Sequence, residues 1–384
     1  MLTKRGWRLL AVAVGLAAAG RVLGMVELFG LAAAAGALLV GAIVYVQVRR
    51  PRLGLRRTLH PGRVAAGGAT VVELVLANDG LRRSPLVESS DGAVQALAGP
   101  LRPGESGWWR YGLPAPYRGI VPVGPAVVRL TDPFGLAART IPGLAPSLLV
   151  VHPRSEVLVP PPRPGGRPGS GPAMGARPLV DLAELSTLRP YQPGDDLRRV
   201  HWPTVARVDE LVVRHDESPA PWHCVVVLDL RAPSHDALTA EEAVSAAASL
   251  VRGCADDDGL VRLVTTGGYD SGLGGGASHV EAVLDALAGA GADATPGLGR
   301  VGATVGPSPD ARTLVVVSGA GLGPADVAAL GPARGPADML VAVRLLPAGV
   351  PPATLLVDRL VDVPWGTPFG RVWNATFTGV LVPR

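Results

Sequence analysis

The greatest concentration of chemically versatile side chains lies in one segment, Thr187–Arg214 (TLRPYQPGDDLRRVHWPTVARVDELVVR). It combines five arginines with carboxylates, a histidine, a tyrosine and a tryptophan, whereas most of the chain is Ala, Gly, Val, Leu and Pro. Guanidinium and carboxylate groups can form two-point ion pairs that lock a segment in place. Tyr, Trp and Arg are also the residue types that carry binding energy at protein interfaces. The candidate residues for these two roles, structural or interacting, are Arg189, Tyr191, Gly194, Asp195, Asp196, Arg198, His201, Trp202, Ala206, Arg207 and Arg214.

A catalytic role for the segment is the alternative. His201 could act as a base and Asp195 could orient it. However, no Ser or Cys lies in a nucleophile context such as GxSxG, and the sequence contains no Walker A string. We therefore assign no catalytic residues and expect no enzymatic activity, while an enzyme or enzyme subunit of envelope assembly remains the competing hypothesis.

The elements that carry these residues are short. Tyr191–Asp195 (YQPGD) predicts a type II turn, because Pro fits its second position and Gly the position of positive φ. Asp195 can then cap a helical stretch that runs to His201. Glu210–His215 returns to the pattern of a strand.

The order and spacing of these residues, together with Pro193 and Leu211, resemble the signature of the bacterial DUF58 family of unknown function. The resemblance implies an immunoglobulin-like sandwich before the signature and a von Willebrand factor A-like α/β domain after it. Proteins of this family are commonly associated with MoxR-type AAA+ ATPases. The resemblance thus implies a membrane-anchored, non-catalytic adaptor or scaffold that works with such an ATPase.

A metal site is the second chemical possibility, since von Willebrand A domains that bind a divalent ion use an Asp-x-Ser-x-Ser loop after a buried strand. Here Asp229 ends such a strand, but Arg231 takes the place of the first hydroxyl and Ser234 lies one position too late. A hard cation needs several converging oxygen ligands. The site near Asp229 and Ser234 is therefore degenerate: we expect no metal and no cofactor, and Asp229 should cap its loop or pair with Arg231. A divalent-cation-dependent binding module remains an alternative.

The beginning of the chain predicts a membrane anchor. With 48% hydrophobic residues and a mean hydropathy of +0.30, the composition is too apolar for an ordinary soluble protein. Apolar runs at about 7–25 and 28–48 are long enough to form a transmembrane hairpin, although a cleaved signal peptide is a rival interpretation of the first. By the positive-inside rule, the basic residues outside both runs place the soluble domains in the cytoplasm, beneath a bacterial inner membrane. The residues expected to meet anionic lipid are Arg49, Arg50, Arg52, Arg56 and Arg57.

Composition limits other functions. Only 4% of the residues are aromatic, so a nucleic-acid surface of basic and stacking side chains is not expected. Cys224 and Cys254 are the only cysteines and have no metal-ligand spacing, which predicts two buried thiols.

The fold class predicted is multidomain: a two-helix transmembrane hairpin, an all-β immunoglobulin-like sandwich and an α/β doubly wound domain. Strands are expected at Thr70–Ala77, in four further runs up to His152, and then alternating with helices from Cys224 to Leu345. The predicted boundaries are 1–50 for the hairpin, 54–158 for the sandwich, 159–179 for a Pro/Gly-rich linker, 180–218 for the signature segment, 219–350 for the von Willebrand A-like domain and 351–384 for a C-terminal extension.

Overall fold

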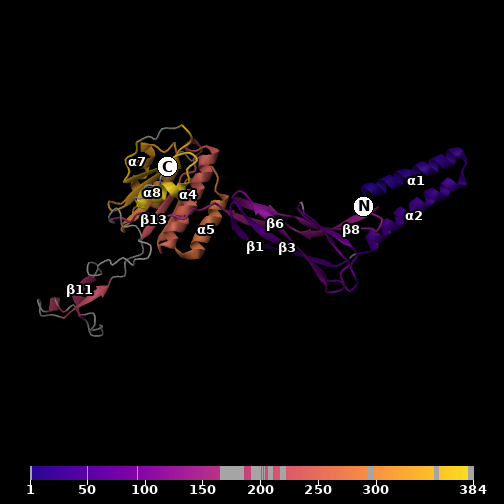
Figure 1. The fold of residues 1–384 in the computed structure, drawn as a ribbon, viewed down its shortest axis with the longest axis horizontal. Helices are drawn as coiled ribbons and strands as arrows, with labels where there is room; N and C mark the ends of the chain where they lie inside the picture. Colours follow the sequence, from indigo (N-terminus) through magenta and orange to yellow (C-terminus); the bar gives the residue numbers. More distant parts are fainter. Residues whose placement is uncertain are drawn as a thin grey trace. The chain divides into compact units, whose positions relative to one another are not determined.

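The computed structural model divides into two compact units, Met1–Pro153 and Arg154–Arg384, each of which is described by itself (Figure 1). The structure describes residues 2–49, 51–92, 94–164, 186–191, 200, 202, 204–205, 211–216, 222–292, 297–349 and 354–378.

The first unit begins with an antiparallel pair of helices, α1 (Lys4–Leu23) and α2 (Val26–Val48). Gly24 ends α1 with a positive φ of 71°, a conformation that glycine adopts without the steric penalty of a Cβ, and this permits the tight turn into α2. At about 1.5 Å per residue, α2 measures roughly 34 Å, against about 30 Å for the hydrocarbon core of a bilayer. Both helices are long and apolar enough to cross a membrane.

Ten strands follow α2 and form three small sheets, in the orders β1-β3-β6, β2-β10-β7 and β5-β4-β8-β9. All neighbouring strands are antiparallel except β2 and β10. In β3, buried and less buried positions alternate along the strand, with Val72, Leu74 and Leu76 on the buried face. The strands are β1 (Leu53–His60), β2 (Arg63–Ala65), β3 (Gly68–Asn78), β4 (Val87–Asp91), β5 (Val94–Ala98), β6 (Ser106–Ala115), β7 (Gly119–Val123), β8 (Ala126–Thr131), β9 (Ala138–Leu144) and β10 (Ser147–His152).

The helix pair is joined directly to one end of this β region. The Thr3 hydroxyl caps α1 and also donates to the Gly135 carbonyl at 2.6 Å, while Leu2 forms a β-bridge with Ala137. Val46 of α2 is buried in the same apolar cluster as residues of the strands. The helices and the β region of this unit therefore share one hydrophobic core at their junction.

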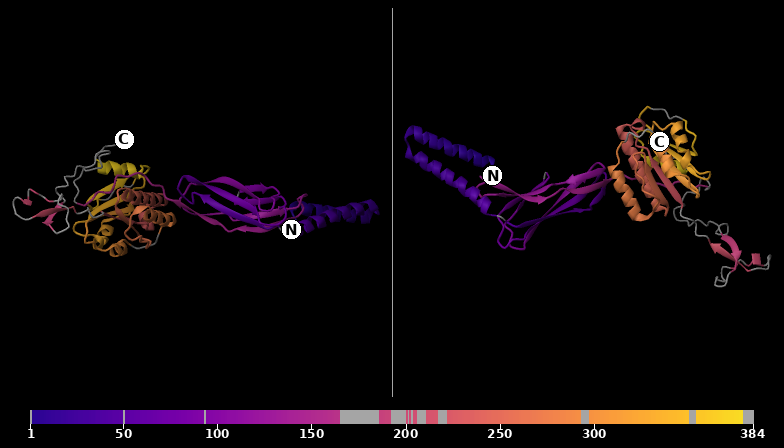
Figure 2. Two further views of the ribbon diagram at one scale, coloured as in Figure 1. Left: turned by 90° about the horizontal axis from the view of Figure 1, so that it is seen from below. Right: turned by 180° about the vertical axis from the view of Figure 1, so that it is seen from behind.

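The second unit contains a five-stranded parallel sheet in the order β14-β13-β15-β16-β17. Alternate residues of β13 enter two separate apolar clusters, Val226 on one face and Val227 on the other, so helices cover both faces (Figure 2). This arrangement confirms the predicted α/β sheet. Its elements are β13 (His223–Leu228), α4 (Ala237–Asp256), β14 (Leu260–Thr265), α5 (Gly276–Gly289), α6 (Gly299–Val305), β15 (Arg312–Gly319), α7 (Pro324–Ala329), β16 (Met339–Leu345), β17 (Arg359–Val363) and α8 (Phe369–Thr378).

The α/β fold does not end at residue 350. Strand β17 pairs with β16, and Trp373 of α8 is completely buried, with its indole N–H donating to the Val159 carbonyl at 3.0 Å. The short charged sequence of β17, RLVDV, does not stand out as a strand, and it forms one because β16 offers an open edge. The predicted C-terminal extension thus completes the domain.

The division between the units also lies earlier than the predicted boundary at 158. Leu158 is buried in an apolar cluster of the α/β sheet, and the Val159 amide donates to the Asn374 side chain at 2.8 Å. Further along, the Thr313 hydroxyl donates to the Pro162 carbonyl at 2.5 Å. The beginning of the Pro-rich stretch is therefore part of the α/β unit.

In the sequence between β10 and β13, the strands β11 (Ser186–Pro190) and β12 (Val212–Asp216) form an antiparallel pair. The Tyr191 amide extends the pair by donating to the Leu211 carbonyl at 2.8 Å. Both cysteines are free and buried, which confirms the prediction for Cys224 and Cys254.

Candidate functional site

The candidate site lies where β13 and β15 end, around the carboxylate of Asp229. This side chain is completely buried. Arg231 approaches it with two guanidinium nitrogens, Nε at 2.9 Å from Oδ1 and Nη2 at 2.9 Å from Oδ2, and its backbone amide donates to Oδ1 at 3.0 Å. The Ser318 hydroxyl adds a fourth hydrogen bond, to Oδ2 at 2.7 Å. Asp229 thus both caps its loop and pairs with Arg231, whereas the sequence predicted one role or the other.

Arg231 connects this carboxylate to a second one. Its Nη1 lies 2.8 Å from Oδ1 of Asp326, which stands in the first turn of α7. The other oxygen of Asp326 accepts a hydrogen bond from the Gly323 amide at 3.1 Å. Sequence analysis did not identify Asp326 as part of this site; the acid in the first turn after Gly323-Pro324 was the available signal. One guanidinium therefore stands between two carboxylates.

Topology explains why these side chains meet. Strand β13 lies between β14 and β15. The chain adds β14 on one side of β13 and then β15, β16 and β17 on the other, so the order of strands reverses direction at β13. In open parallel sheets, the carboxyl ends of strands at such a switch point form the usual ligand crevice. Asp229 directly follows β13, and Ser318 lies near the end of the neighbouring strand β15.

The electrostatics of the site follow from its burial. Burial alone would raise the pKa of Asp229, but hydrogen bonds from Arg231 and Ser318 and the charge of Arg231 outweigh it, so the pKa is lowered. The hydrogen bond to Asp229 in turn raises the pKa of Arg231. The pair stays charged over the whole physiological range.

His235 completes the loop. One ring nitrogen, Nε2, is 2.7 Å from the backbone carbonyl oxygen of Asp229, and the other, Nδ1, is buried without a hydrogen-bond partner. Burial lowers the pKa of His235, although the contact with Asp229 opposes this effect. The neutral imidazole is therefore the favoured form in the folded protein.

The guanidinium of Arg231 supplies the positive charge that a metal ion would bring to such a crevice. Ser234 lies in the same loop, and its backbone packs so closely against Gly319 and Gly321 that a Cβ at either glycine would collide with it. Among the residues that the structure describes, no group of three or more His, Cys, Asp or Glu side chains is arranged to hold a metal. The arrangement can bind a cation only if Arg231 withdraws.

The signature segment is described in part. Arg189 and Arg214 lie on β11 and β12, where Arg189 is opposite Val213 and Leu188 opposite Arg214. Tyr191 is half-buried, whereas Trp202 is 63% exposed. The remaining predicted residues lie outside the described part of the chain: Gly194, Asp195, Asp196, Arg198, His201, Ala206 and Arg207.

One of the predicted lipid-binding arginines has a different role. The side chain of Arg57 is only 1% exposed and makes a two-point ion pair with Asp91, at 2.9 Å and 2.5 Å. It also donates to the Val123 carbonyl at 2.8 Å, and the Tyr111 hydroxyl donates to Asp91 at 2.9 Å. Arg57 therefore stabilises the β region and is not available to lipid, in contrast with its exposed neighbour Arg56. The sequence could not separate them, because alternation along β1 decides which arginine points inward.

Comparison with known proteins finds a match to a family model over part of the chain. Residues 187–346 match the model of a family described as "Protein of unknown function DUF58". The match begins at β11 and includes the site around Asp229, which supports the resemblance inferred from the signature. No curated protein sequence matches the chain.

Proposed function

We propose that this protein is a membrane-anchored, non-catalytic adaptor, in which α1 and α2 cross a bacterial inner membrane and the signature segment docks a partner protein in the cytoplasm. The α/β unit acts as a von Willebrand A-like module that does not depend on a metal, and the preceding β region as an immunoglobulin-like sandwich. The partner proposed is a MoxR-type AAA+ ATPase, as the resemblance to the DUF58 family implies.

The observation that carries the docking role is the exposure of Trp202. Trp202 is 63% exposed, and leaving it so forfeits much of the free energy that burial of this large apolar side chain would provide. Leu211, in the same segment, is 42% exposed. Exposed Trp side chains of this kind are frequent energetic centres of protein interfaces. A purely structural role for the signature would place this ring in a core.

The site around Asp229 supports the non-catalytic and metal-independent part of the proposal. Each carboxylate oxygen of Asp229 already accepts hydrogen bonds from within the protein, and the charge of Arg231 balances it. Because each oxygen of this carboxylate already accepts two hydrogen bonds, it has no unoccupied lone pair to offer a substrate proton or a cation. The competing hypotheses are an enzyme that uses His201 and Asp195, which lie outside the described part of the chain, and a cation-dependent module.

The test is affinity purification of the full chain from native membranes, with identification of partners by mass spectrometry. Trp202→Ala is compared with Trp108→Ala, which removes an equally exposed tryptophan (63%) from β6. Recovery of an AAA+ ATPase with wild type and Trp108→Ala, but not with Trp202→Ala, would support docking through the signature. Equal recovery with both variants, or no ATPase with wild type, would contradict it.

A further inference from the structure

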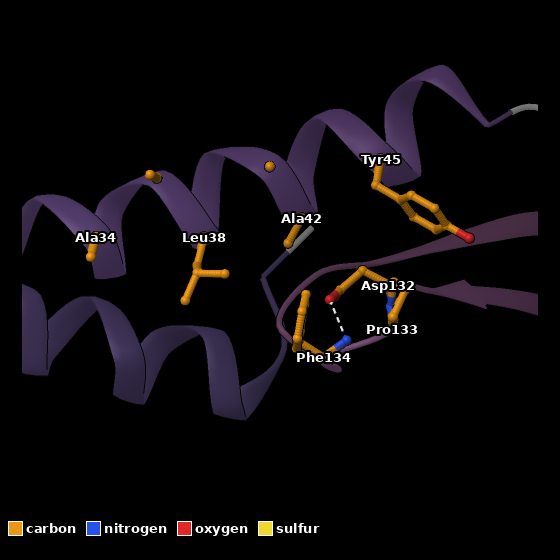
Figure 3. A pocket seen from close by; sticks show the side chains of 9 residues that line it. Ala34, Leu38, Ala42, Tyr45, Asp132, Pro133 and Phe134 are labelled. Carbon is orange, nitrogen blue, oxygen red and sulfur yellow. Dashed lines mark hydrogen bonds between the residues drawn. The ribbon is translucent and has the colours of Figure 1, made fainter.

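An apolar groove runs along α2 where the helix pair meets the β region. Its volume is about 520 Å³, within the range of small-molecule sites. One wall is the turn at Pro133 and Phe134, between β8 and β9, and the floor is one face of α2 (Figure 3). The α2 residues that line it are Ala34, Ala37, Leu38, Gly41, Ala42 and Tyr45.

The shape of the groove follows from residue size. Ala34, Ala37 and Gly41 have small side chains or none, so they leave the floor low. Leu38 projects from α2 on the side where Phe134 lies (Figure 3). A Cβ placed on Gly41 would meet no atom within 4 Å, so this part of the floor is open space. Phe134 is 66% exposed and Leu38 is 46% exposed, so apolar surface borders the groove.

The groove has the length of one lipid chain. From Ala34 to Tyr45 the helix rises about 16 Å, and one leaflet of a bilayer contributes about 15 Å of hydrocarbon. Since α2 is long and apolar enough to cross a membrane, this face would lie within the leaflet next to the β region. An apolar groove at this depth is filled by hydrocarbon and not by water.

Positive charge stands at the end of the groove near the β region. The guanidinium of Arg49 lies 5.8 Å from the centre of the Tyr45 ring. Nη1 of Arg5 lies 3.6 Å from the point where a Cβ on Gly135, the residue after Phe134, would stand. Asp132 also lines this end, but its two oxygens accept hydrogen bonds from the Phe134 and Ala137 amides. Two exposed arginines therefore flank the point where a headgroup would emerge.

From this combination we infer that the groove is a binding site for one membrane phospholipid. Its acyl chain lies along α2 from Tyr45 to Ala34, against Phe134. Its phosphate pairs with Arg5 and Arg49, since cations near the bilayer surface attract anionic headgroups. The occupant is assigned as a lipid because the charges complement a phosphate, whereas a second copy of this chain would bring the same arginines and repel. The bound lipid would hold the β region at a fixed angle to the membrane.

This inference rests on the membrane anchor of the proposed function, but not on the ATPase partner. The full chain is first assigned to membrane or soluble fractions of the cell, and is then purified in a mild detergent with added palmitoyl-oleoyl phosphatidylglycerol. Native mass spectrometry counts the retained lipids. The structure predicts one tightly retained phospholipid per chain.

Two leucine substitutions on the same helix provide a matched pair. Gly41→Leu fills the groove and should abolish retention, whereas Gly36→Leu should leave it unchanged, because Gly36 lies about 140° further round α2 and also has no atom within 4 Å of its Cβ position. Both changes replace a mid-helix glycine, so their effects on helix propensity are equal. Replacing both Arg5 and Arg49 by Gln should weaken phosphatidylglycerol retention at least about tenfold.

Other outcomes would overturn the inference. Equal lipid retention by Gly41→Leu and wild type would remove the groove as the site. A wild-type dimer without lipid, separated into monomers by Gly41→Leu, would assign the groove to a second copy. If the protein is bound to the membrane but retains no lipid, only the lipid site in the groove would be contradicted. If the chain is found only in the soluble fraction, the membrane anchor of the proposed function would be contradicted as well.

Discussion

Arg231 and Asp229, only two positions apart in the sequence, form a two-point ion pair inside the α/β unit, with both nitrogen–oxygen distances at 2.9 Å. A pair so close in sequence can form only because the chain turns sharply after β13, where the Arg231 amide also binds Asp229. Arg231 then extends to Asp326 on α7. It thus ties the loop after β13 to the helix after β15.

Loss of this arginine should destabilise the α/β unit strongly. Arg231→Ala leaves the buried carboxylate of Asp229 without its counter-charge, and breaking such a pair costs about 3–5 kcal/mol. Arg334→Ala is the control: its pair with Asp358 is more than a third exposed on both sides and contributes about 0–1 kcal/mol. Urea unfolding monitored by circular dichroism measures both. Equal effects of the two substitutions would contradict the structural importance of the Asp229 pair.

Divalent cations should distinguish wild type from the same variant. Millimolar Mg²⁺ or Mn²⁺ should leave the Tm of wild type unchanged, because the guanidinium of Arg231 occupies the cation position. In Arg231→Ala, the oxygens of Asp229, Asp326 and Ser318 face an open pocket that hard cations favour, so Tm should rise with either ion. Differential scanning calorimetry tests this. An increase in wild type would show that the site takes a metal despite Arg231.

The stability of the protein should fall with mild acidification because of His235. Burial lowers its folded-state pKa below the ordinary value of 6.5, so the unfolded chain binds more protons in this window. The free energy of unfolding should therefore decrease as pH falls through about 6.5 towards the folded-state pKa. His235→Gln should reduce the slope between about pH 7 and about pH 5. An unchanged slope would show that other groups cause the dependence.

Two adjacent arginines of β1 should behave differently. Arg57→Gln removes the buried partner of Asp91 and should lower the stability of the β region by about 3–5 kcal/mol. Arg56→Gln alters an exposed side chain and should change stability by less than about 0.5 kcal/mol. Chemical denaturation of the two variants provides the comparison. Similar losses in both would mean that Arg57 does not anchor this end of the sheet.

Local patterns in the sequence were sufficient for much of the secondary structure. The apolar runs predicted α1 and α2, and the run CVVVLDL predicted β13, because burial on both faces of a parallel sheet requires such continuous hydrophobicity. Helix α4 begins at Ala237 with Asp236 as its cap, although Thr239 and Glu242 also have the spacing of a capping box. Asp and Thr can both satisfy free amides, and only the backbone decides which of them does so.

Three features depended on tertiary structure. Strand β17 and helix α8 complete the α/β unit because β16 has an open edge and Trp373 fits its core, neither of which is visible in a short charged segment. Arg57 is buried although its neighbours are exposed. The groove beside Phe134 exists because a turn between β8 and β9 meets a helix about ninety residues earlier in the chain.

The sequence by itself therefore determined the order of apolar helices, strands and α/β elements, and it showed that Arg231 would bring a positive charge to the loop after Asp229. These properties depend on residues close together in the chain, where periodicity and turn chemistry act directly. The tertiary structure alone decided which carboxylates that charge meets, which arginine is exposed, and where the domain ends. Those outcomes depend on long-range packing. Packing buries some charge pairs, which strengthens their attraction, and it leaves others in water.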